Sequence, residues 1–157
     1  MSHFGKYRGQ VVDTIDPLEL GRLKVTVPSV LGEGVHSWAM PCVPYAGPQV
    51  GFVALPPVGA HVWVEFEEGS PDASIWTGCF WGAGELPGGG IPGRTKRFRT
   101  EAVTLELGED PGSAALSVEV GGPAADPPLR LVLDADGLKL SQGAASMRLS
   151  PPPPPPA

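Results

Sequence analysis

Four acidic side chains close together in the sequence suggest one kind of chemistry, the hydrolysis of glycosidic bonds. Glu65, Glu67, Glu68 and Asp72 lie within one short stretch. Two carboxyl groups held about 5–9.5 Å apart in a cleft cleave such bonds, so we weigh a cell-wall hydrolase, which would release soluble fragments from peptidoglycan. The stretch Glu-Glu-Gly-Ser-Pro-Asp is also typical of a turn between two strands. We favour a solvated turn and expect no catalytic residue and no enzyme.

Metal-binding residue types are scattered along the chain. His3, His36 and His61 form neither an HxH nor an HExxH motif, and Cys42 and Cys79 form no CxxC pair. Many structural and catalytic metal sites are recognisable by ligands at such short spacings. We therefore expect no metal and no cofactor. Because both cysteines lie in apolar runs, we expect buried free thiols, and a disulfide stays open if their strands are adjacent.

One basic cluster could bind nucleic acid, and it consists of Arg94, Lys96, Arg97 and Arg99. Single strands bind to charged grooves in which aromatic side chains stack on the bases. The stacking candidates are Trp38, Trp63, Trp76, Phe80 and Trp81. A formal net charge of −6 works against this reading, because phosphates are recognised by Lys and Arg. We expect the aromatic residues to pack in a core or between subunits, and the basic residues to form a collar paired with Glu101 or with a neighbouring chain.

Short strands must position these residues. The chain has 22 Gly and 20 Pro, which excludes a helical bundle, but 41% of its residues are hydrophobic, which is enough for a core. Short β-branched and aromatic runs bounded by Gly, Pro and Asp indicate strands. Six such runs precede residue 82, namely 7–14, 21–28, 37–43, 52–55, 61–66 and 75–81. With no helical segment between them, they predict a small closed or nearly closed barrel.

The second half of the chain presents an apolar face that one sheet cannot bury. After a Gly-rich linker at 82–93, five alternating runs follow at 103–107, 116–120, 129–133, 138–140 and 147–149. Their apolar residues would cover roughly 800–1,500 Å², whereas monomers rarely expose more than about 300–600 Å² in one patch. The face therefore packs either on the first domain or against identical faces around an axis. The residues concerned are Val103, Leu105, Leu107, Leu116, Val118, Val120, Leu129, Leu131, Leu133, Leu138, Leu140, Met147 and Leu149.

An ordered series of motifs resembles one family. The series runs GRLKVTVP, SWA, PYAG, GF, LPPVGAHVWVEF, GSPD and IWTG, and it covers about residues 7 to 81. It resembles the OB-fold domain of the central spike of contractile injection systems, as in phage baseplate assembly protein V and the valine-glycine-repeat protein G of type VI secretion. Met40, Ala60 and Ser70 depart from the family pattern. The residues that carry the resemblance are Gly21, Arg22, Val25, Pro28, Trp38, Gly47, Pro56, Gly59, Val62, Val64, Phe66, Gly69, Pro71 and Gly78.

The resemblance implies an all-β chain, with an N-terminal OB-fold barrel followed by a short trimeric β-prism or β-helix needle. The expected domains are the OB fold at 1–81, the linker and basic collar at 82–99, the needle at 100–150 and a polyproline tail at 151–157. The implied function is that of a non-enzymatic, membrane-puncturing homotrimeric spike that joins a baseplate hub and inner tube to a PAAR-type tip protein. The alternative is an OB-fold module that binds single-stranded nucleic acid or oligosaccharide.

The polar N-terminal residues 1–10 lack the apolar core of a signal peptide, so we expect the protein to be made in the cytoplasm, and its acidity leads us to expect no nucleic-acid binding. The resemblance implies assembly into a phage tail-like particle that meets the target membrane only on firing. Some spikes of the family hold iron through an apical HxH, but no His follows residue 61 here, so an apical metal would come from a separate tip protein.

Six consecutive prolines at 151–156, followed by Ala157, favour an extended polyproline II rod of roughly 19 Å. The rod is either a disordered tail or a cap that docks the tip protein, through Pro151, Pro152, Pro153, Pro154, Pro155 and Pro156.

Overall fold

The protein is described by a computed structural model that covers residues 2–88, 94–110 and 114–151. Nearly all of its regular structure is β, as the sequence predicts. The chain divides into two compact units, Met1–Leu86 and Pro87–Ala157. Within the described residues, no helix is both long enough and apolar enough to cross a membrane.

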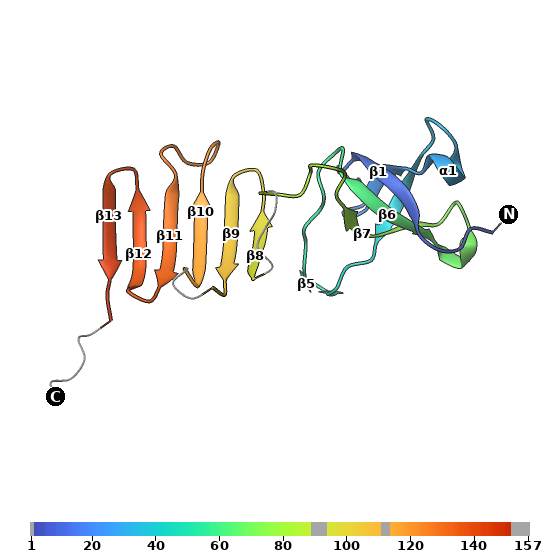
Figure 1. The fold of residues 1–157 in the computed structure, drawn as a ribbon. Helices are drawn as coiled ribbons and strands as arrows, with labels where there is room; N and C mark the ends of the chain where they lie inside the picture. Colours follow the sequence, from blue (N-terminus) through green and yellow to red (C-terminus); the bar gives the residue numbers. More distant parts are fainter. Residues whose placement is uncertain (1, 89–93, 111–113, 152–157) are drawn as a thin grey trace. The chain divides into compact units, whose positions relative to one another are not determined.

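The first unit is a closed five-stranded barrel. Its strands are β1 (Tyr7–Asp13), β2 (Leu23–Thr26), β3 (His36–Pro41), β6 (His61–Phe66) and β7 (Ser74–Phe80). They close in the order β1-β2-β3-β7-β6, with β3 and β7 parallel and the other pairs antiparallel (Figure 1). A five-stranded Greek-key barrel is the architecture of the OB fold, so the predicted barrel is confirmed.

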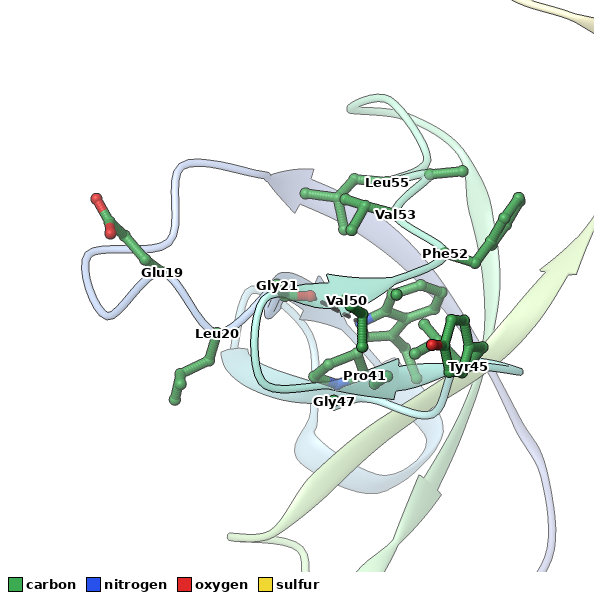
Figure 2. Close-up of a pocket in the computed structure, with 15 residues that line it drawn as sticks. Glu19, Leu20, Gly21, Pro41, Tyr45, Gly47, Val50, Phe52, Val53 and Leu55 are labelled. Carbon is green, nitrogen blue, oxygen red and sulfur yellow. Dashed lines mark hydrogen bonds between the residues drawn. The ribbon is translucent and has the colours of Figure 1, made fainter.

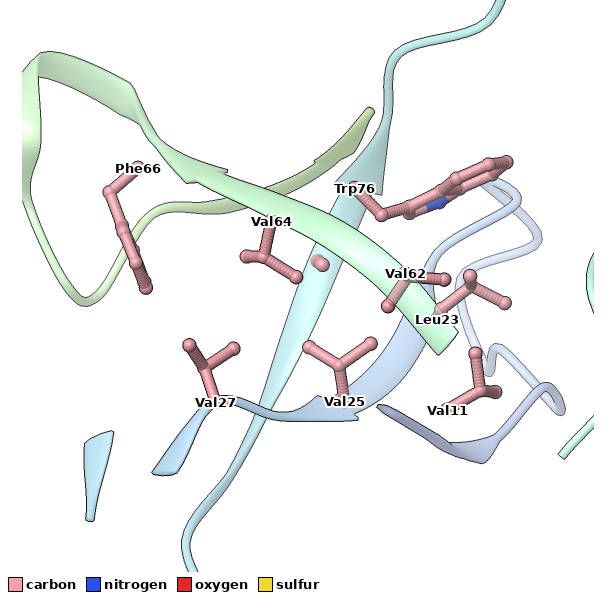
Figure 3. Close-up of a cluster of buried hydrophobic side chains, with 9 residues drawn as sticks. Val11, Leu23, Val25, Val27, Val62, Val64, Phe66 and Trp76 are labelled. Atoms are coloured by element: carbon pink, nitrogen blue, oxygen red, sulfur yellow. The ribbon is translucent and has the colours of Figure 1, made fainter. Parts of the chain in front are cut away.

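The core of the barrel follows from the alternation of its strands. In β6, Val62, Val64 and Phe66 are buried, while the intervening residues are partly exposed. Side chains from the other strands meet them at the centre (Figure 3). Burying each apolar side chain contributes about 1.5–3 kcal/mol, so this cluster holds the barrel together. The full cluster is Val11, Leu23, Val25, Val27, Ala39, Val62, Val64, Phe66 and Trp76.

The connections of the barrel differ from the sequence prediction in two places. Pro28–Leu31 forms a one-turn helix, α1, with Pro28 in the first turn, where its missing N–H costs nothing. The predicted strand at 52–55 is wrong: a short hairpin of β4 (Ala46–Gly47) and β5 (Val50–Gly51) lies just before it. Residues 52–55 form no ladder, and two prolines follow them at once. A 3-10 turn, η1 (Glu67–Gly69), joins β6 to β7.

The prediction that the cysteines are buried is also wrong. Cys42 and Cys79 are both free and both exposed. Cys42 comes directly after β3, and Cys79 is the penultimate residue of β7. The ends of strands at the rim of a barrel are less covered than their centres, which accounts for the exposure of residues that lie in apolar runs.

The second unit is a six-stranded antiparallel meander. Its strands are β8 (Thr95–Arg99), β9 (Val103–Gly108), β10 (Leu116–Val120), β11 (Leu129–Asp134), β12 (Gly137–Gln142) and β13 (Ala145–Leu149). Each strand pairs with its neighbours in sequence (Figure 1). Residues 95–99, predicted to belong to the linker and basic collar, form strand β8. Three of its five residues are basic, which hid the strand pattern.

Two expected features fall partly outside the described residues. Residues 89–93 of the expected linker do so, and so do Pro152–Pro156 of the tail. Every buried hydrophobic residue of the described chain belongs to the first unit.

Candidate assembly surfaces

The register of the second unit places the thirteen apolar residues singled out from the sequence on one face of the sheet. Residues directly opposite each other in antiparallel strands point to the same face. Three columns of side chains therefore cross the strands. The first column is Leu107, Leu116, Leu133, Leu138 and Leu149; the second is Leu105, Val118, Leu131, Leu140 and Met147; the third is Val103, Val120 and Leu129.

Sequence reasoning missed one member of this face. Phe98 of β8 lies opposite Leu105, and so begins the second column. Its side chain is 49% exposed, and at the other end of that column Met147 is 61% exposed. The apolar face keeps a large accessible area in the single chain, because none of its residues is among the buried hydrophobic ones.

The opposite face of the sheet is charged and largely self-neutralised. Arg130 pairs with Glu119 at 2.7 Å, across the β10–β11 ladder. Arg148 donates to both carboxylate oxygens of Asp134, at 3.0 and 3.1 Å, and this contact holds the pKa of Asp134 below its ordinary value. Exposed pairs of this kind contribute little stability each, so their main effect is to keep this face polar.

The basic residues expected to form a collar pair within their own chain. Lys96 contacts Glu109 at 2.5 Å, Arg94 contacts Asp110 at 3.5 Å, and Arg97 pairs with Glu106 directly across the β8–β9 ladder. Glu101, the expected partner, contributes to none of these pairs. The partners are set by the β8–β9 hairpin, which the sequence analysis missed. A nucleic acid would have to displace these carboxylates, so the alternative function loses support.

The loop between β1 and β2 is ordered around one carboxylate. Asp16 accepts hydrogen bonds from the backbone N–H groups of Leu18, Leu20 and Arg22. Its Oδ1 also accepts from the Arg22 guanidinium, at 3.0 Å from Nε and 2.6 Å from Nη2. The Arg22 contact holds the pKa of Asp16 well below its usual range; burial opposes it, and the backbone donors support it. The Arg22 side chain also stacks over Trp38, 5.1 Å from the ring centre.

The residues that carry the family resemblance occupy two kinds of position. Val25, Val62, Val64 and Phe66 lie in the core. The glycines lie at tight backbone positions: Gly59, for example, has a φ of 90° and donates its N–H to the carbonyl of Val11 at 2.8 Å. Gly47 lies in β4, Gly78 in β7 and Pro28 in α1. Pro56 and Pro71 lie in the connections between elements. The carbonyl of Gly21 accepts a hydrogen bond from the indole N–H of Trp76.

Gly69 is the most constrained of these glycines. It is buried, with a φ of 77°. A Cβ at this position would lie 3.0–3.1 Å from Ser2, His3 and Phe4. The N–H of His3 donates to the Gly69 carbonyl at 2.9 Å, so the N-terminal segment packs directly on the β6–β7 turn.

An apolar pocket of about 330 Å³ lies beside the β4–β5 hairpin (Figure 2). Tyr45 and Phe52 flank the hairpin, Val50 lies in it, and Leu20 comes from the Asp16 loop. Glu19 is the one charged residue among those that line the pocket. We call the exposed apolar lining the hairpin surface; its members are Leu20, Tyr45, Val50, Phe52, Val53 and Leu55, which are 40–83% exposed.

The aromatic residues do not form one stacking platform. Trp76 belongs to the core. Trp63 packs against Phe80, with ring centres 4.6 Å apart, and Arg8 stacks on both rings. Trp81 is 63% exposed.

The acidic group weighed for hydrolysis shows no catalytic arrangement. Glu65 pairs with Lys6 at 2.7 Å, while Glu67 and Glu68 are exposed in η1. Among the described residues, no cluster of three or more His, Cys, Asp or Glu side chains could hold a metal ion.

Comparison with known proteins finds similarity to a domain family and to a curated relative. Residues 7–81 match the family described as the type VI secretion system/phage-baseplate injector OB domain. The chain is also 38% identical over 73 residues to the actin cross-linking toxin VgrG1 of Vibrio cholerae serotype O1 (strain ATCC 39541 / Classical Ogawa 395 / O395). That alignment covers 44% of this chain and 7% of the relative, so most of the toxin has no counterpart here.

The matched segment coincides with the barrel, from the first residue of β1 to the residue after β7. Residues 7–81, and with them the whole barrel, are therefore similar to the injector OB domain of type VI secretion systems and phage baseplates.

Proposed function

We propose that this protein is the homotrimeric central spike of a contractile injection system, and that its role is structural rather than enzymatic. The observation that carries the proposal is the combination of an injector-type OB domain with a sheet that gathers thirteen apolar side chains on one face. Three such faces packed around an axis would bury that area, whereas a single sheet leaves it accessible. The proposed needle is thus a prism with the charged face of each sheet outside.

The geometry of the sheet suits a needle. Hydrogen-bonded strands lie about 4.7–4.9 Å apart, so the six strands of the meander span about 24 Å from the first to the last. The first apolar column runs from β9 to β13, the second from β8 to β13. These apolar columns, packed around an axis, would form a dry, close-packed core that resists bending.

The proposed partners follow from this role. The OB domains would bind a trimeric baseplate hub at the end of the inner tube, and the far end of the needle would carry a PAAR-type tip protein. The protein would be assembled into a tail-like particle and driven through a target envelope when the sheath contracts. The polyproline tail follows β13 directly, so we place its function at the tip end of the needle.

Light scattering of the purified full chain tests the proposal. The expected mass is three times the chain mass of 16.3 kDa. A monomer at micromolar concentration would contradict the proposal, because the apolar face of the sheet would then be stable in water.

Binding of single-stranded oligonucleotides tests the alternative function. We expect no binding even at low salt, since three of the four basic residues are paired with carboxylates. Salt-sensitive binding that is lost when Arg94, Lys96, Arg97 and Arg99 are neutralised would restore that alternative.

A further inference from the structure

We propose that the hairpin surface packs against the first unit of a second copy of this chain, so that the barrels of a trimer contact one another. The inference rests on the proposed homotrimer and adds a second interface to it, in the OB domain. The area, the charge and the rigidity of the hairpin surface support this contact.

The area of the hairpin surface decides between a free partner and a tethered one. Six side chains of this size at 40–83% exposure present on the order of 600 Å². That equals the largest patch usual on a monomer, but it is less than the roughly 800 Å² per partner that a stable, independent complex buries. A copy already tethered through the needle is present at an effective concentration of about a millimolar, so a smaller contact is sufficient.

The charge of the hairpin surface favours a copy of the same chain. Each chain carries a net charge of −6, so identical copies repel each other across most of their surfaces. The stretch from Gly34 to Val64 contains no Asp, Glu, Lys or Arg, and it includes five of the six residues of the hairpin surface. Copies can meet there without repulsion. A separate partner protein is usually steered by complementary charges, which this surface lacks except for Glu19 at its edge.

The hairpin surface is held in shape before any contact forms. The N–H of Phe52 donates to the Tyr45 carbonyl at 2.9 Å, which closes the base of the β4–β5 hairpin. On the other side of the pocket, the backbone of Leu20 is fixed by its hydrogen bond to Asp16 at 2.8 Å. Little ordering is then required on binding, so most of the apolar contact contributes to association.

The experiment compares the full-length wild type with Val53→Glu and a matched control, Val35→Glu. Val53 is 83% exposed, so a carboxylate there leaves the barrel intact but places a charge in the proposed contact. Val35 is 47% exposed and is not among the residues that line the pocket. Backbone amide exchange over residues 45–55 is measured in each protein, with exchange over β6 as a check of the barrel and light scattering as a measure of mass.

We expect a trimeric mass in all three proteins, because the needle holds the trimer. Exchange over 45–55 should be about tenfold or more faster in Val53→Glu than in the wild type, while Val35→Glu matches the wild type. Phe52→Glu provides a second variant, and it should behave like Val53→Glu.

Two outcomes overturn the inference, and they are distinguishable. A trimeric wild type whose exchange over 45–55 equals that of Val53→Glu overturns the barrel contact alone and leaves the surface to another protein. A monomeric wild type overturns the proposed trimer, and the barrel contact with it.

Discussion

At the scale of single residues, the carboxylate of Asp16 shapes a whole loop. Five donors meet its two oxygens, and its side chain is only 5% exposed. A buried carboxylate that accepts this many hydrogen bonds is stabilised in its charged form, which lowers its pKa. The same loop presents Leu18 and Leu20 to solvent, so one charge fixes the position of exposed apolar side chains.

The first prediction concerns the pH dependence that Asp16 confers. Its folded pKa lies below the unfolded value near 4, so its stabilising effect is complete above about pH 5 and is lost as the pH falls through the folded pKa. We expect Asp16→Asn to lower the melting temperature at pH 7, and the difference from the wild type to shrink below about pH 4. Melting curves from pH 2 to 7 measure this.

Asp72→Asn is the control for that experiment, because Asp72 is exposed in the turn after η1. If the difference in melting temperature between the wild type and Asp16→Asn stays constant down to pH 2, the charge of Asp16 does not stabilise the loop.

The second prediction separates backbone strain from crowding at glycine. Gly69→Ala places a side chain at a positive φ and against the N-terminal segment, so we expect a loss of about 2–3 kcal/mol in unfolding free energy. Gly34→Ala has a similar φ of 72° with no atom within 4 Å of the new Cβ, and should lose only about 1–2 kcal/mol. Denaturant unfolding measures the unfolding free energy of both variants. Equal losses of unfolding free energy would mean that the N-terminal segment moves aside in Gly69→Ala.

At the scale of elements, the sheet of the second unit has two faces of opposite character on the same strands. Val118 of β10 lies in the second apolar column. Val132 of β11 lies opposite Ser117 and Lys139, on the polar face. These two valines on adjacent strands make it possible to change one face at a time with the same substitution.

The third prediction follows from that pair. Val118→Asp would place a carboxylate from each chain near the axis of the proposed needle, where desolvation costs several kcal/mol per charge. We expect it to abolish the trimer, whereas Val132→Asp, beside Lys139, leaves the trimer intact. Sedimentation of both variants provides the measurement. A trimer in Val118→Asp, or its loss in Val132→Asp, would contradict the proposed packing.

Strands with clean alternation could be predicted from the sequence, and strands without it could not. The runs at 61–66 and 116–120 coincide with β6 and β10, because each alternates apolar and polar residues between clear breaks. β8 was missed because its single apolar residue, Phe98, lies among basic ones, and it pairs only because β9 is next to it. Residues 52–55 have strand composition but no ladder partner. Periodicity reports which faces are apolar, not which strands pair.

Of the two candidate assembly surfaces, one could be predicted from the sequence and the other could not. The apolar face of the second unit could be proposed from residue spacing, because a period of two defines a face whatever the register. The hairpin surface could not, because Leu20 and Val53 come from separate loops that only the closed barrel brings to one pocket. The pairing of Lys96 with Glu109 likewise depends on a hairpin that the sequence analysis placed in a linker.

At the scale of the whole molecule, the two units have separate tasks in the proposed spike. In that proposal, the OB domain would provide the connection to the baseplate, and the sheet would provide the trimer axis. The fourth prediction is that residues 1–93 alone trimerise poorly, because the hairpin surface is too small to hold copies together without the needle. Light scattering at increasing concentration measures this. A stable trimer of that fragment would show that the sheet is dispensable for assembly.

The connectivity of the two sheets has a consequence for the order in which the chain folds. In the meander every strand pairs with its neighbours in sequence, whereas the barrel needs β1 to pair with β6, more than fifty positions away. Pairings between neighbouring strands form faster than distant ones, because closing a shorter loop costs less conformational entropy. In the proposed trimer, however, the meander gains its core only when it meets two more chains. Refolding should therefore show a barrel phase that is independent of protein concentration and a later phase, reporting on the second unit, whose rate rises with concentration.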